Sequence, residues 1–152
     1  MKAIVFSDSH RNFSSILNAL EKEKDIDLII HAGDVHKDVE DILFGMPQIP
    51  CAYVLGNNDF FVMDEPSERE FTFGNKKIFL THGHTYGVKG SLSRLKSEAR
   101  RVGAEICIFG HTHSTYLENE DGIWYLNPGP TWKGYGIINI TNDKIDIKIV
   151  EN

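Results

Sequence analysis

The stretch Asp27-Leu28-Ile29-Ile30-His31-Ala32 contains an apolar run that lacks the alternation of a half-exposed strand and is too short for a helix. A strand of this kind is buried on both faces, which is typical of a parallel sheet. Similar runs occupy residues 2–6 and 51–55, and apolar residues recur at helical spacing within 13–20 and 39–43. The first third of the chain therefore predicts alternating strands and helices.

The pattern changes after Asp59. Residues 70–73 and 77–80 flank Gly74-Asn75, which is a hairpin signal, and the apolar positions within 92–102 predict another helix. The remaining apolar runs predict strands at 106–109, 115–118, 123–126, 135–140 and 144–149, with tight turns at Asp121-Gly122 and Asn142-Asp143. We therefore expect an α/β (α+β) fold in which two mixed β-sheets pack together and helices cover the outside. The length suggests a single domain over residues 1–152.

Composition and charge exclude several classes of protein. Hydrophobic residues make up 41% of the 152 residues and the net charge is −6 without any Lys or Arg run, so strong nucleic-acid binding is not expected. No apolar segment has the length of a signal-peptide core or a membrane span. Cys51 and Cys107 lie in apolar runs, which favours free thiols and a cytoplasmic location, although a disulfide between them stays open. The sequence predicts no particular oligomeric state.

Polar side chains follow five of the apolar runs at the point where each run ends. Asp, Asn or His residues gather at these five positions, four of them with an adjacent glycine, namely Ser7-Asp8-Ser9-His10, Gly33-Asp34, Gly56-Asn57-Asn58-Asp59, His82-Gly83-His84 and Gly110-His111-Thr112-His113. Taken singly, each cluster is adequately explained as a turn or a helix cap. Open α/β sheets, however, bind ligands at the carboxyl ends of their strands, and five such clusters together indicate one site.

These side chains are the ligand set of a mixed nitrogen and oxygen metal site. A carboxylate such as that of Asp34 can bridge two ions, because each of its oxygens can bind a different one. Two ions about 3.5–4 Å apart activate a water and stabilise the charges of an in-line displacement at phosphorus. The absence of thiolates favours Mn²⁺, and also admits Ni²⁺, Fe²⁺ or Zn²⁺, over a structural zinc site.

In this order, Asp8-x-His10, Gly33-Asp34, Gly56-Asn57-x-Asp59, His82 and Gly110-His111-x-His113 resemble the calcineurin-like metallophosphoesterases. Asn127-Pro128-Gly129 extends the resemblance to the small prokaryotic phosphodiesterase branch. Each motif alone is weak, whereas the ordered set is specific. The resemblance implies a four-layer αββα sandwich and hydrolysis of a small phosphate ester, with a phosphodiester preferred, by a hydroxide that bridges two divalent ions.

The same resemblance assigns the metal ligands. It implies that one ion is bound by Asp8, His10 and His113 and that Asp34 bridges to the second ion. The second ion would be bound by Asn57, His82 and His111.

One motif position departs from the family pattern. Many members have a histidine between Asn57 and Asp59 that acts on the leaving group, and this chain has Asn58. An amide can donate a hydrogen bond to a phosphoryl oxygen, but it supplies no proton near neutral pH. Asn58, Asp59 and His84 are therefore our candidate catalytic residues, with Asp59 as a partner that orients its neighbour. His84 and His36 are alternative acids.

A rival hypothesis assigns the fold to partner binding. The retromer scaffold subunit is related to this branch, and a scaffold or regulatory module would need little turnover. The complete set of ligand positions argues against a scaffold, whereas Asn58 is the feature that favours a metal-bound regulatory module.

Overall fold

The computed structural model describes all residues, 1–152, and contains two five-stranded sheets. In the first sheet, β1, β2 and β3 are parallel, β9 pairs antiparallel with β1, and β10 pairs antiparallel with β9. The strand order is β10-β9-β1-β2-β3, with bounds Lys2–Phe6 for β1, Leu28–His31 for β2, Cys51–Tyr53 for β3, Gly134–Thr141 for β9 and Lys144–Glu151 for β10.

The second sheet is also mixed. Its strands β5, β6 and β8 are parallel, while β4 and β7 are antiparallel edge strands. The order is β4-β5-β6-β8-β7, with bounds Glu68–Phe73 for β4, Lys76–Thr81 for β5, Ile106–Ile108 for β6, Tyr116–Glu120 for β7 and Ile123–Asn127 for β8. The predicted pair of mixed sheets is confirmed.

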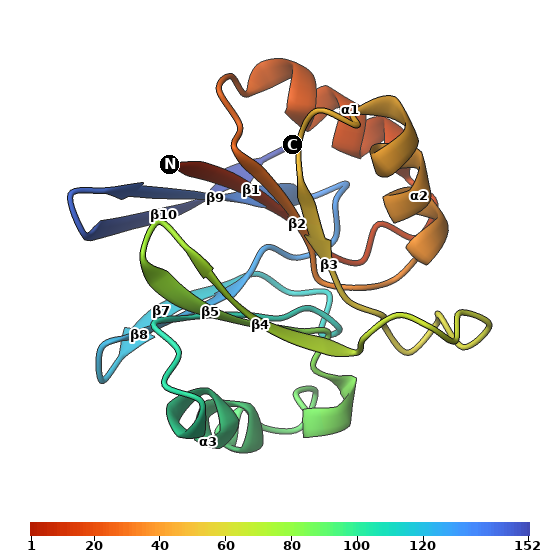
Figure 1. Cartoon of the computed structure of the whole chain (residues 1–152). Helices are drawn as coiled ribbons and strands as arrows, with labels where there is room; N and C mark the ends of the chain where they lie inside the picture. The colour runs from red at the N-terminus through yellow and green to blue at the C-terminus, as the bar shows by residue number, and fades with distance from the viewer.

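Helices cover the outer face of each sheet (Figure 1). The helices α1 (Phe13–Lys22) and α2 (His36–Gly45) lie over the first sheet, and α3 (Ser93–Arg101) lies over the second. A short 3₁₀ helix, η1 (His84–Tyr86), follows β5 and was not expected from the sequence. The result is the expected four-layer αββα sandwich. No helix is both long enough and apolar enough to cross a membrane.

The alternation of side chains along the strands divides the apolar core into three layers. Between the sheets, Val5, Ile30, Leu80 and Ile108 belong to one cluster of buried side chains. The neighbouring residues on the same strands point outward and pack under the helices. For example, Phe6 packs with Ile16 of α1, and Phe79 packs with Leu95 of α3. Burial on both faces explains the continuous apolar runs of the central strands.

Several details differ from the sequence expectations. The strand expected at 51–55 ends at Tyr53, because the chain turns there and the Leu55 N–H donates to the Pro66 carbonyl.

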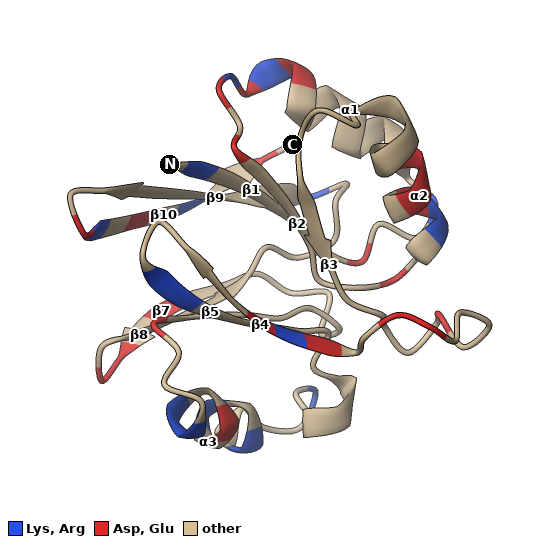
Figure 2. Ribbon diagram, in the orientation of Figure 1, with Lys and Arg blue, Asp and Glu red and all other residues tan.

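Cys51 and Cys107 are free thiols, as favoured by their positions. Lys and Arg are prominent on α3, whereas acidic residues lie on α2 and on the loop that leads into β4 (Figure 2).

Candidate metal centre

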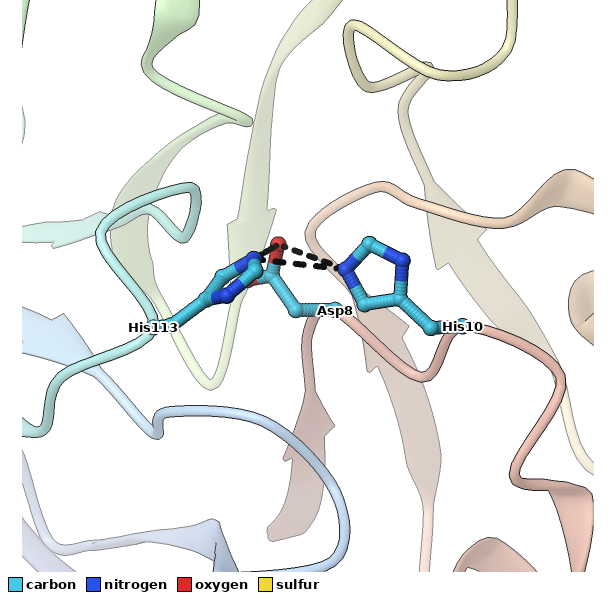
Figure 3. Close-up of side chains that lie close together, drawn as sticks. All are labelled: Asp8, His10 and His113. Carbon is cyan, nitrogen blue, oxygen red and sulfur yellow. Dashed lines mark hydrogen bonds and ion pairs between the residues drawn. The ribbon is translucent and has the colours of Figure 1, made fainter.

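The Asp8 carboxylate lies in the loop after β1, and its two oxygens have different surroundings. Oδ2 accepts the Ser7 hydroxyl at 2.5 Å and the His111 backbone N–H at 3.0 Å. Oδ1 is buried and has no hydrogen-bond partner. The Nε2 atoms of His113 and His10 lie 3.3 Å and 3.7 Å from Oδ1, and the His113 side chain faces those of Asp8 and His10 from a different loop (Figure 3).

His82 lies at the end of β5 and is fully buried. Its Nδ1 is 2.8 Å from the Ala32 carbonyl oxygen, which can only accept, so Nδ1 carries the proton. In the neutral ring, Nε2 then presents a lone pair. That lone pair faces carboxylate or amide oxygens of Asn57 at 3.0 Å, Asp34 at 3.5 Å and Asp8 at 3.8 Å.

Imidazole nitrogens and carboxylate or amide oxygens thus lie close together, and their lone pairs face one another. Asp8, His10 and His113 can place one ligand atom each within 4.8 Å of one another, and Asp8, Asp34 and His82 can do the same. The His10 and His113 Nε2 atoms are themselves only 3.3 Å apart. A cation satisfies such a set of lone pairs, and imidazole mixed with carboxylate suits a divalent transition metal. The residues therefore fit the ions that the sequence predicts.

Asp34, the expected bridge, lies in the loop after β2 and is 1% exposed. Its Oδ1 accepts the backbone N–H of Asn58 at 3.0 Å, and its Oδ2 accepts the Asn58 side-chain amide at 2.7 Å. Gly56 allows this approach, because a Cβ atom there would overlap Asp34 Oδ1. The amide of Asn58 is thus directed at the central carboxylate in this structure.

Asp59 holds the loop instead of facing the cluster. Its Oδ2 accepts the N–H groups of Gly56 at 2.8 Å and Asp34 at 3.3 Å, and its Oδ1 accepts the His36 N–H at 2.8 Å. Each oxygen is therefore used by backbone donors. This arrangement makes Asp59 a positioning residue that fixes the loops after β2 and β3 relative to each other.

His111 and His84 lie next to His82 without entering either group of ligand atoms. The His111 ring is 5.1 Å from the His82 ring and 6.0 Å from the His84 ring, measured between centroids. Burial lowers the pKa of His111 to about 4 and also lowers the pKa of His84. A neutral His111 is the form that binds a metal. His84 has a buried Nδ1 without a hydrogen-bond partner.

The family model described as the calcineurin-like phosphoesterase superfamily domain matches residues 1–140. The chain belongs to this family. It is thus a metal-dependent phosphoesterase by family, and its Asp, Asn and His clusters are the candidate ligands of divalent metals.

Similar proteins support this assignment. A probable metallophosphoesterase of Bacillus subtilis, YsnB, is 32% identical over 99% of this chain and 91% of its own length. A protein of Methanocaldococcus jannaschii named a phosphodiesterase is 28% identical over 85% of this chain and 83% of its own. A predicted phosphoesterase of Streptococcus pneumoniae has a TM-score of 0.82 at 25% identity, covering 99% and 88% of the two chains.

The fold is also shared with Vps29, a protein whose name does not describe a phosphoesterase. Vps29 of Entamoeba histolytica, in a single-mutant form, has a TM-score of 0.79 at 22% identity, and the match covers 100% of this chain and 99% of that protein. At this identity the similarity concerns the fold alone.

A buried polar network of Ser9, His31 and Asp38 lies next to the candidate metal centre and was not expected from the sequence. Ser9 donates to Asp38 Oδ2 at 2.6 Å, and His31 Nε2 lies 3.0 Å from the same hydroxyl oxygen. The Ser9 backbone N–H also donates to the Asp34 carbonyl at 2.8 Å. The network thereby ties the loop that carries Asp8 to the loop that carries Asp34. A serine on each side of Asp8 was the only sequence signal, and it is a weak one.

The downstream loop supports the histidines of the loop after β6. The Asn127 side-chain amide donates to the Gly110 carbonyl at 3.1 Å and to the Thr112 hydroxyl at 3.0 Å, and its Oδ1 accepts the Gly129 N–H at 2.9 Å. Asn127 is completely buried. The resemblance at Asn127-Pro128-Gly129 therefore corresponds to a structural support for His111 and His113.

Several expected ligands have a strained backbone. A positive φ, rare outside glycine, occurs at 52° for Asp8, 45° for His10, 50° for Asp34, 71° for His111 and 58° for His113. Such conformations persist only where the surrounding contacts hold them, and they cluster at functional sites. Here the contacts are the hydrogen bonds from Ser7, Ser9, Asn58 and Asn127 described above.

Proposed function

We propose that the chain hydrolyses phosphodiesters in preference to phosphomonoesters, with two divalent ions and Mn²⁺ as the first choice of metal. The observation that carries this proposal is the convergence of carboxylate, amide and imidazole lone pairs around His82 Nε2 and Asp8 Oδ1 without intervening protons. The diester preference is supported by the Methanocaldococcus relative, whose name is phosphodiesterase. The two free thiols of this chain, Cys51 and Cys107, suit a cytoplasmic location.

In this proposal, Asp8, His10 and His113 would hold one ion, Asn57, His82 and His111 would hold the other, and Asp34 would be shared between them. When bound, the ions would lower the pKa of a water and neutralise the phosphoryl oxygens. The role of the protein is to fix the ligands. The bond from His82 Nδ1 to Ala32 sets the tautomer that leaves Nε2 free, and Ser7 and the His111 N–H orient Asp8.

Asn58 cannot supply the proton that the leaving group needs. Its amide donates to Asp34 Oδ2, and an amide does not release a proton in this pH range. His84 is the nearest candidate from the adjoining loop, because its ring lies 5.5 Å from that of His82. Burial lowers its pKa, so only a small fraction is protonated at neutral pH. We therefore expect leaving groups of low pKa to react best.

The test compares bis-p-nitrophenyl phosphate with p-nitrophenyl phosphate in the presence of Mn²⁺, together with the metal content of the protein. We expect about two equivalents of metal and faster turnover of the diester. Asp34→Asn should lower turnover by at least about a hundred-fold, because its amide no longer offers two anionic oxygens. Asp146→Asn, on the exposed part of β10, is the control and should leave turnover unchanged.

A single equivalent of metal, or full activity of Asp34→Asn at saturating Mn²⁺, contradicts the two-ion proposal. Binding of two ions without turnover of any ester would instead favour the alternative, a scaffold or regulatory module on the same fold. The similarity to Vps29 motivates this alternative, and the complete set of ligand side chains argues against it.

A further inference from the structure

A recess of about 330 Å³ lies between the loop after β3 and η1. Its volume lies at the lower end of the range of about 300–1,000 Å³ for small-molecule sites. Its wall combines apolar side chains with polar ones. The lining residues used below are Leu55, Asn57, Phe60, Val62, Ser67 and His84.

The recess is continuous with the candidate metal centre. Asn57 contributes to both, since its Oδ1 lies 3.0 Å from His82 Nε2. His84, on the other side, has its ring 5.5 Å from that of His82. A phosphoryl group held among the metal ligands would therefore have one of its substituents next to this recess.

Phe60 supplies an aromatic side chain beside the recess and is 70% exposed. The turn that carries it is well defined, because the Asp59 N–H donates to the Gly56 carbonyl and the Val62 N–H donates to the Asp59 carbonyl, both at 3.1 Å. Asp59 in turn is held by backbone donors of the metal-site loops. An exposed phenylalanine in a braced turn is poorly explained by packing, and it offers a flat face to a ligand.

We propose that this recess takes a ring-bearing ester arm of the substrate, an aryl or nucleobase group that stacks on Phe60. The inference rests on the proposed phosphoesterase function and narrows its substrate class to phosphate esters with a planar ring near the phosphorus. Stacking on an aromatic side chain tolerates different rings, because every ring has a π-face. Esters that carry only small alkyl arms leave the recess empty and bind more weakly.

A second recess, of about 230 Å³, gives an internal control. It lies on the other side of the same turn and is lined by Phe61, His36, Lys37 and Glu40, among others. Lys37 and Glu40 form an ion pair of 3.5 Å, so this wall is charged. Phe61 is 89% exposed and its ring centroid is 4.7 Å from that of Phe60. Phe61→Ala therefore changes the same loop by the same number of atoms and removes no side chain that lines the first recess.

The experiment measures binding of phenylphosphonate and methylphosphonate to the Mn²⁺-loaded protein by calorimetry, which does not depend on turnover. We expect phenylphosphonate to bind about ten-fold more tightly, as stacking energies predict. Phe60→Ala should abolish this preference by weakening phenylphosphonate alone, and Phe61→Ala should retain it. Turnover of p-nitrophenyl esters, measured in parallel, should fall in Phe60→Ala through KM rather than kcat.

The possible outcomes distinguish failure of the recess assignment from failure of the phosphoesterase proposal. Equal binding of the two phosphonates, or the same loss in Phe60→Ala and Phe61→Ala, overturns the recess assignment and leaves the phosphoesterase proposal intact. Binding of neither phosphonate overturns the recess assignment, and the phosphoesterase proposal is overturned as well if the loaded protein turns over no p-nitrophenyl ester. A preference that persists in Phe60→Ala also overturns the assignment, because the ring then lies elsewhere.

Discussion

At the scale of single residues, Asn58 is the position where the chemistry departs from the family pattern. Its side chain donates to Asp34 Oδ2, so one amide hydrogen remains for another acceptor. General acid assistance is typically worth about 10²–10⁴ in rate, and rates without it should fall steeply as the leaving-group pKa rises. Asn58→His should flatten this dependence by accelerating the poorest leaving groups. A series of aryl and alkyl diesters, measured on both proteins, gives the two slopes.

The competing explanation is that His84 or His36 already acts as the acid. In that case the slope of the wild-type protein would be shallow, and Asn58→His would change it little. His84→Asn separates these cases, because it steepens the slope only if His84 donates the proton. Equal and shallow slopes in all three proteins would mean that the consequence of Asn58 is assigned wrongly.

Gly56 sets the distance between the loop after β3 and the Asp34 carboxylate. A Cβ atom at Gly56 would overlap Asp34 Oδ1 and also approach the Asp34 backbone nitrogen, so Gly56→Ala must displace the carboxylate. We expect Mn²⁺ affinity, measured by titration calorimetry, to fall by at least about ten-fold, which is the usual range for disturbed support of a ligand.

Gly45→Ala is the matched control for this change. No atom lies within 4 Å of a Cβ atom built at Gly45, which is the last residue of α2. Alanine has a higher helix propensity than glycine, so the Gly45→Ala protein should be slightly more stable and bind metal normally. Equal affinities in Gly56→Ala and Gly45→Ala would show that the Asp34 carboxylate tolerates the displacement.

At the scale of elements, most of the sandwich could be predicted because burial imposes a simple pattern on each strand and helix. The hairpin at Gly74-Asn75 and the helix expected within 92–102 are confirmed. The 3₁₀ helix η1 could not be predicted, because it depends on the positive φ angles of Gly83 and Gly87 and has no apolar period. The strand order within the sheets depends on pairing between distant segments, which local patterns do not encode.

The candidate metal ligands could be predicted from the sequence, whereas the residues that orient them could not. Residues that could bind a metal follow the strands and are visible as clusters of Asp, Asn and His. The groups that orient them are ordinary polar residues, such as Ser9 and Asp38, whose roles arise only when α2 packs behind the loop after β1. No spacing rule connects two residues that are 29 positions apart.

The network at the end of β2 also predicts a pH effect. His31 is completely buried, and burial lowers its pKa to about 4 from the 6.5 of an exposed histidine. The unfolded chain therefore binds a proton more readily than the folded protein between these values. Stability is fully present above pH 6.5 and is lost as the pH falls toward 4. For one such group the loss is about 1 kcal/mol per pH unit within this window.

This effect can be isolated by comparing wild type with His31→Gln in chelator, using denaturant unfolding at pH 7, 6 and 5. Glutamine does not titrate, so the variant should lose stability less steeply on acidification even if it is less stable at pH 7. The chelator removes the contribution of metal ions, whose ligands also titrate. Parallel stability profiles of the two proteins would contradict the assigned pKa.

At the scale of the whole molecule, the candidate ligands belong to both sheets. Asp8, His10, Asp34 and Asn57 follow strands of the first sheet, whereas the loops after β5 and β6 of the second sheet supply His82, His111 and His113. Elsewhere the sheets meet through an apolar layer and through Arg69 of β4, whose Nε donates to the Tyr53 carbonyl of β3 at 2.7 Å. Ions bound at this edge would therefore join the two sheets, and metal binding should stabilise the entire fold.

The size of this stabilisation follows from mass action, because the ions bind the folded protein and find no assembled site in the unfolded chain. At a metal concentration about 100 times Kd, one ion contributes about 2.7 kcal/mol, which raises the Tm of a chain of this length by roughly 5–10 °C. Calorimetry with Mn²⁺ against chelator should show this gain, and His113→Ala should reduce it, since His113 is half-exposed and contributes little to packing. His36→Ala, which removes a histidine outside both ligand groups, should keep the full gain. A gain that persists unchanged in His113→Ala at saturating Mn²⁺ would place the stabilising ion elsewhere on the molecule.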